Sequence, residues 1–118
     1  MTLQKAVVAF TQSEKIKSGI IWLSQALEMV ARMPENHRRG AEKTARVFMS
    51  LMLQDIHLAR KLTREPSWED AEKDIDLALV MLDSGVAHEC NYHLTRALSR
   101  VTDIGQRSMT VLRGEGLL

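Results

Sequence analysis

Apolar residues recur along most of the chain at alternating intervals of three and four positions, which is the period of an amphipathic α-helix. The clearest stripe contains Ile16, Ile20, Leu23, Leu27 and Val30. Residues 11–14, Thr-Gln-Ser-Glu, have the form of a capping box, and Pro34 cannot continue a helix, so a first helix is predicted over about residues 12–33. Residues 1–10 fall outside this register, and we expect them to form an N-terminal arm or a short helix.

Three further segments show the same helical period. The second, at about residues 35–63, carries a stripe of Ala41, Ala45, Phe48, Met52, Ile56, Ala59 and Leu62. The third, at about residues 67–84, carries Trp68, Ala71, Ile75, Leu79 and Leu82. The fourth, at about residues 86–113, carries Ala87, Cys90, Leu94, Ala97, Val101 and Ile104. We expect Ser67 to cap the third helix and Gly85 to end it in a left-handed backbone conformation.

Four amphipathic helices with short connections predict an all-α, antiparallel up-down four-helix bundle. A chain of 118 residues supports one hydrophobic core, so we expect a single domain over residues 1–118. Gly85 leaves one alternative open. If the helix continued through Gly85, the last two helices would fuse into one long rod, and a swapped dimer would then bury both halves.

The charges of the two middle helices are complementary. Residues 34–64 hold seven basic and three acidic residues, whereas residues 65–85 hold one basic and seven acidic residues. Opposite charges on neighbouring antiparallel helices favour the intended hairpin over other pairings. The segregation of charge is therefore interpreted as a feature of the fold rather than as a binding site.

Composition excludes several classes of protein. With 45% hydrophobic and 26% charged residues, the chain has the balance of a globular protein. Its longest apolar runs, residues 47–53 and 77–82, are far shorter than the roughly 20 residues that cross a bilayer. A net charge of +1 gives no strong field, so neither a membrane nor nucleic acid is expected as a partner. The single cysteine, Cys90, cannot form an internal disulfide, which favours a cytoplasmic location.

No residue pattern predicts a metal, a cofactor or a catalytic centre. His88 and His93 lie five positions apart and diverge by about 140° on a helix, whereas zinc-binding histidines on one helix face lie four apart. No Glu precedes a His by three positions, as the di-iron sites of helical bundles require. Cys90 lies on the apolar stripe, where a thiol behaves as a small hydrophobe. We therefore expect a non-catalytic protein without a bound metal or cofactor.

His93 supports one alternative that involves chemistry. His93, Arg96 and Ala97 resemble the His-x-x-Lys-Gly pattern of histidine phosphotransfer domains, in which a helix of a bundle presents a phosphorylatable histidine. The resemblance covers only this short motif, its glycine is absent, and the bulky Leu94 follows the histidine. It implies a phosphotransfer-type signalling module that uses His93.

Asp55 is a carboxylate on the apolar side of the second helix, about 20° from Phe48 on a helical wheel. An ionised carboxylate in a core is costly unless it is paired. Two interpretations follow. Either Asp55 pairs with a basic residue near the end of the bundle, or it is the polar anchor of a small-ligand pocket or of a partner interface.

Several helices carry more apolar residues than one core-facing stripe requires. On the first helix, three such residues lie about 100° from the stripe, and nearly every residue between 47 and 53 is apolar. Clustered apolar residues outside a core mark interfaces. We therefore predict a homodimer, with the stretch 47–53 near its two-fold axis. The residues expected in its interface are Trp22, Met29, Met33, Val47, Leu51 and Leu53.

The function predicted from these observations is a non-catalytic protein-interaction or assembly module that associates with itself, with another protein as a further candidate partner. Two alternatives stay open: the phosphotransfer module that uses His93, and a small ligand-binding protein with a polar pocket near Asp55. Bundles serve many unrelated functions, so the fold does not decide among the three.

Overall fold

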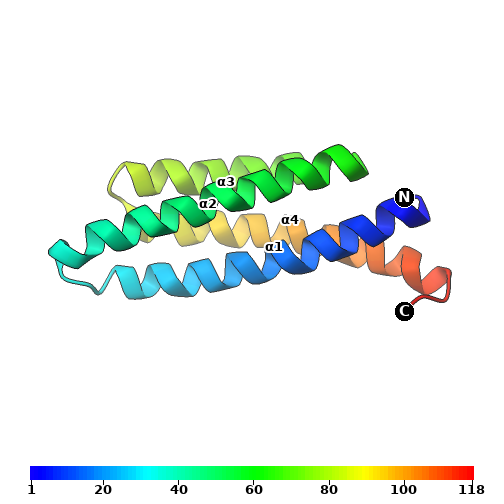
Figure 1. The fold of residues 1–118 in the computed structure, drawn as a ribbon, viewed down its shortest axis with the longest axis horizontal. Coiled ribbons are helices and arrows are strands. Elements are labelled where there is room, and N and C mark those ends of the chain that lie inside the picture. The colour runs from blue at the N-terminus through cyan, green and yellow to red at the C-terminus, as the bar shows by residue number, and fades with distance from the viewer.

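A computed structural model of residues 1–118 shows four antiparallel α-helices packed side by side around one core (Figure 1). They are α1 (Leu3–Val30), α2 (Glu35–Thr63), α3 (Ser67–Asp83) and α4 (Cys90–Gly114), with a short 3-10 helix, η1 (Ala87–Glu89), before α4. Each helix packs along its predecessor, and α4 returns to lie beside α1. The molecule measures 53 × 22 × 18 Å. The predicted all-α antiparallel four-helix bundle is confirmed.

One hydrophobic core of twenty buried residues runs along the bundle and receives side chains from all four helices. The stripe predicted for α1 is buried in full. The stripes predicted for α3 and α4 are buried except at Leu79 and Ala87, which are partly exposed. The helical period of the apolar residues therefore determines which face of these helices forms the core.

The face predicted for α2 is wrong at two positions. Phe48 and Leu62 are half exposed, whereas their neighbours Met49 and Thr63 are buried. The buried stripe of α2 points between its two neighbours, α1 and α3, and this turns Phe48 and Leu62 outward. Thr63 occupies a buried position despite its hydroxyl, because that hydroxyl forms hydrogen bonds inside the protein.

The first helix begins much earlier than predicted. It starts at Leu3, and the hydroxyl of Thr2 caps it by accepting a hydrogen bond from the Lys5 amide at 3.2 Å. The predicted capping box at residues 11–14 lies inside this helix, where the hydroxyl of Ser13 donates to the Phe10 carbonyl of the preceding turn. Small buried side chains, Ala6 0%, Ala9 0% and Ser13 2% exposed, continue the apolar stripe toward the N-terminus. Residues 3–10 are therefore helix and not an arm.

Gly85 separates α3 from α4, so the two helices do not form one rod. Its backbone is left-handed, with φ of 79°. Its amide donates to the Leu82 carbonyl, and the Val86 amide donates to the Met81 carbonyl. These two bonds form a Schellman motif, in which glycine is favoured because it has no Cβ to clash.

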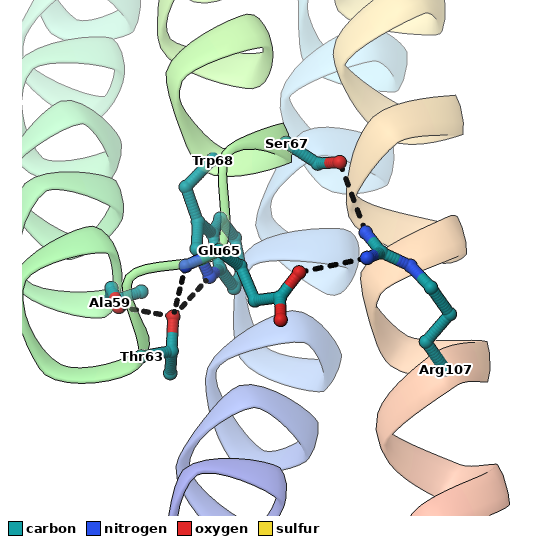
Figure 2. Close-up of polar contacts among 6 residues, drawn as sticks. All are labelled: Ala59, Thr63, Glu65, Ser67, Trp68 and Arg107. Atoms are coloured by element: carbon teal, nitrogen blue, oxygen red, sulfur yellow. Dashed lines mark hydrogen bonds and ion pairs between the residues drawn. The ribbon is translucent and has the colours of Figure 1, made fainter. Parts of the chain in front are cut away.

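The turn between α2 and α3 is tied to the rest of the bundle by a polar cluster (Figure 2). The Thr63 hydroxyl donates to the Ala59 carbonyl at 2.8 Å and accepts from the buried Trp68 indole at 3.0 Å. Arg107 of α4 donates to Glu65 at 2.8 Å and to Ser67 at 3.0 Å. Ser67 therefore accepts from Arg107 and does not cap α3 as predicted, since the capping position is Pro66.

The complementary charges of α2 and α3 meet as the sequence predicts. Arg46 lies 2.8 Å from Asp83, while Arg60 and His57 lie 3.2 Å and 2.9 Å from Glu72. The hydrogen bond from Arg46 lowers the pKa of the Asp83 carboxyl. The acidic and basic segments thus join neighbouring helices at the surface, where each pair contributes little stability but favours this helix order.

Candidate interaction surface

The outer side of α1 and α2 carries a set of exposed apolar side chains, which we call the α1–α2 face. Its largest members are Trp22, which is 71% exposed, and Phe48, which is 56% exposed. On α2 the remaining members recur at intervals of four and seven positions, so they lie on one side of the helix. The face consists of Trp22, Met29, Val47, Phe48, Leu51, Leu58 and Leu62.

A groove of about 180 Å³ runs between the two helices on this face. Trp22 and Phe48 line it from opposite helices, and Met52 forms part of its lining. The hollow exists because Gly19 and Ala26 occupy the positions where larger side chains would fill it. A Cβ added to Gly19 would lie 3.8 Å from the Met52 sulfur, an ordinary contact, so packing does not require glycine there.

Asp55 lies on the same face and pairs with Lys15 of α1. The Lys15 Nζ is 3.1 Å from the Asp55 Oδ2, and the two side chains are 62% and 30% exposed. This is the only ion pair between α1 and α2. The structure shows Asp55 paired with a basic residue, although the pair lies along the flank of the bundle and not near its end. Along α2 the pair lies one turn from Leu51 and one turn from Leu58, so apolar side chains flank it.

The opposite side of the bundle, between α3 and α4, has a different character. The Asp74 carboxylate is buried between Arg96, at 3.5 Å, and Arg100, at 3.8 Å. The Arg96 guanidinium lies 6.0 Å from the centre of the Tyr92 ring. Contact with Tyr92, followed by the charge of Asp74, raises the pKa of Arg96 above its ordinary value. Charge pairs therefore link α3 to α4.

His93 lies on α4, on the side that packs against α3, and is partly buried. Its Nδ1 is enclosed and has no hydrogen-bond partner. The Tyr92 ring stands edge-on to its imidazole, with the ring centres 5.2 Å apart. Phosphotransfer requires an imidazole nitrogen that another protein can reach, and at Nδ1 the protein itself covers this atom.

Cys90 is fully buried and donates a hydrogen bond to the Ala78 carbonyl at 3.1 Å. Burial raises the pKa of its thiol to about 11, with a smaller contribution from the negative charge of Glu42. A nucleophilic cysteine needs a thiolate near neutral pH. Cys90 is therefore a packing residue of the core.

Polar hollows lie at the ends of the bundle. One of them, of about 400 Å³, is open to solvent and lies between the start of α2 and the α3–α4 turn, with Arg39, Glu42 and His88 in its lining. Arg38 and Glu42 on its wall pair with each other at 3.8 Å. Nowhere in the structure do three or more His, Cys, Asp or Glu side chains gather as metal ligands would.

The structure places the six residues of the predicted interface in different environments. Trp22, Met29, Val47 and Leu51 are exposed on the α1–α2 face. Leu53 packs partly against the core, and Met33 is half-buried in the turn after α1. The predicted interface omitted three members of the face, Phe48, Leu58 and Leu62. Phe48 and Leu62 had been assigned to the core, because a helical stripe alone does not show which of two adjacent apolar residues points inward.

No protein family, characterised protein or solved structure matches this chain. None of its helices combines the length and the continuous apolarity that crossing a bilayer requires.

Proposed function

We propose that the protein is a non-catalytic assembly module that forms a homodimer through the α1–α2 face. The observation that carries the proposal is the composition of that face: two aromatic and five aliphatic side chains, all exposed, with one mutually neutralised ion pair among them. Depletion of charge together with enrichment in Trp, Phe and Met distinguishes the core of a protein interface from ordinary surface.

The size of the face supports this proposal. Because aromatic and large aliphatic side chains cover about 150–250 Å² each, the seven residues together expose on the order of 700 Å². The largest apolar patch of a typical monomer is about 300–600 Å², whereas each partner in a standard interface buries about 800 Å². The α1–α2 face lies between these values, and water-exposed apolar area favours burial by roughly 25 cal/mol per Å².

We propose a second copy of the chain as the partner because the face offers both halves of a self-complementary contact. It carries a hollow, the groove between Trp22 and Phe48, and a projecting side chain, Leu51, at the same height along the bundle. A two-fold interface uses the same patch on both subunits, so hollow and projection must both be present on one patch. The face bears no net charge, and a charged partner would gain nothing from it.

The test introduces one charge on each of two matched leucines. Leu51→Glu places a carboxylate in the centre of the α1–α2 face, whereas Leu77→Glu places one on α3, where the leucine is similarly exposed, 44% against 49%. We expect Leu51→Glu to abolish the dimer and Leu77→Glu to leave it intact, as measured by sedimentation velocity. Equal behaviour of the two variants would contradict the proposal.

The alternatives find less support. The enclosed Nδ1 of His93 leaves only its Nε2 for phosphotransfer. The pairing of Asp55 with Lys15 at the surface does not favour a polar ligand pocket there. We further propose a cytoplasmic location, on the ground that the lone, buried Cys90 has no disulfide partner.

A further inference from the structure

Two contacts fix which residues of α1 and α2 lie at the same height along the bundle. Lys15 lies beside Asp55, and Trp22 faces Phe48 across the groove. Two copies can join across the α1–α2 face, as proposed above, in two ways. A two-fold axis parallel to the helices sets α1 of each copy against α2 of the other at equal height. A two-fold axis across the helices sets α1 against α1 and α2 against α2, running antiparallel.

These arrangements differ in what covers the Lys15–Asp55 pair. With the axis across the helices at the height of Leu51, Asp55 of one copy lies against Val47 of the other. The pair would then lose water without gaining a polar partner, which is costly for buried charges. With the axis parallel to the helices, Lys15 of each copy lies opposite Asp55 of the other, and the two pairs join into an alternating ring of four charges.

We propose that two copies associate about a two-fold axis parallel to their helices, α1 of each against α2 of the other, and that the four-charge ring of Lys15 and Asp55 fixes this orientation. This inference rests on the proposed dimer. The apolar residues supply the association, since Trp22 of one copy then packs on Leu51 and Phe48 of the other. The ring selects between the two positions of the axis. Only when opposite charges of the two copies face each other at equal height is the cost of removing these charged groups from water compensated.

Charge reversal tests the ring. The chain carrying Lys15→Asp holds two carboxylates at this point, and the chain carrying Asp55→Lys holds two ammonium groups. We expect each chain alone to dimerise at least about 30-fold more weakly than the unmodified protein. We expect an equimolar mixture to form a heterodimer within about tenfold of the unmodified affinity, because each carboxylate again faces an ammonium group.

The outcomes separate this inference from the proposed function. Sedimentation of the single chains and of the mixture, with circular dichroism to verify that each variant is helical, provides the measurements. If the unmodified chain dimerises but the mixture associates no better than either variant, the proposal of the four-charge ring is wrong, whereas the proposed dimer is supported. If the unmodified chain is monomeric, both proposals fail.

Cross-linking with single cysteines gives a second, independent measurement. One helical turn beyond the ion pair, Thr11 of α1 and Leu58 of α2 are both exposed at nearly the same height. A mixture of Thr11→Cys and Leu58→Cys chains should cross-link efficiently in the parallel arrangement. A mixture of Thr44→Cys and Leu58→Cys chains should cross-link only in the antiparallel one, and efficient product there would overturn the proposal. The buried Cys90 thiol stays protonated and out of reach of the reagent.

Discussion

Two opposite sides of the bundle, the one between α3 and α4 and the one between α1 and α2, differ in the side chains that they present. Between α3 and α4, the buried Asp74 holds two arginines, and Arg107 joins α4 to the turn before α3. Between α1 and α2, one ion pair lies among seven exposed apolar residues. On the first side, charge pairs join the two helices within one chain. The second side exposes apolar surface area, and burying that area against a partner would be favourable.

The two tryptophans show this difference most directly. Trp68 is fully buried at the start of α3, with its indole N–H bonded to Thr63. Trp22 is 71% exposed and lines the groove of the α1–α2 face. One tryptophan therefore contributes to folding, and the other is free to contribute to association.

The largest expected difference in the free energy of unfolding is between the alanine variants of these two tryptophans. Trp68→Ala should lower the free energy of unfolding by about 3–5 kcal/mol, because it leaves a cavity in the core. Trp22→Ala should change it by no more than about 0.5 kcal/mol in dilute, monomeric protein. Urea titrations at low protein concentration compare the two. A large loss for Trp22→Ala there would mean that Trp22 supports the fold of the single chain.

A smaller effect is expected at Thr63, whose hydroxyl serves the polar cluster beside α4. Thr63→Val keeps the shape of the side chain but leaves the buried Trp68 indole without an acceptor, which should cost about 2 kcal/mol. The matched control is Thr11→Val near the α1–α2 face, where the hydroxyl is exposed and bonds only to the Val7 carbonyl. Thermal unfolding of both variants should show a clear loss for Thr63→Val alone, and equal losses would contradict this account.

The smallest effects should appear at two helical glycines. A Cβ on Gly105 would lie 2.8 Å from the Ser13 hydroxyl, where α4 crosses α1 closely, so Gly105→Ala should destabilise the protein by about 1 kcal/mol. Gly19 borders the groove and has room for a methyl group, so Gly19→Ala should stabilise the helix by about 0.5–1 kcal/mol. Opposite signs in denaturant titrations would support the contrast between a tight α1–α4 contact and an open α1–α2 face, and a destabilising Gly19→Ala would refute it.

The sequence predicts the helices and their order well, because apolar period and turn residues act locally. The stripe from Ile16 to Val30 and the left-handed Gly85 are examples. The start of α1 was missed for a local reason as well. Ala6 and Ala9 are too small to give a strong apolar signal, and a Thr-x-x-Glu segment inside a helix has the same sequence as a capping box.

The candidate surface was predicted only in part, because its composition depends on distant contacts. The apolar excess around Trp22 and Leu51 is visible in the sequence, but the choice between Phe48 and Met49 for the core depends on where α1 and α3 lie. Lys15, the partner of Asp55, lies on another helix and has no local signature. A periodic pattern indicates which residues of a helix face a neighbouring helix, but it does not identify the residues that they contact there.

The central claim is that the α1–α2 face joins two copies of the chain. Sedimentation equilibrium of the unmodified protein over a micromolar concentration series tests it most directly. The account predicts a mass of twice the 13.4 kDa of one chain at high concentration, returning to a single chain on dilution. A mass of 13.4 kDa at every concentration would contradict it, and the exposed face would then belong to a stable monomer.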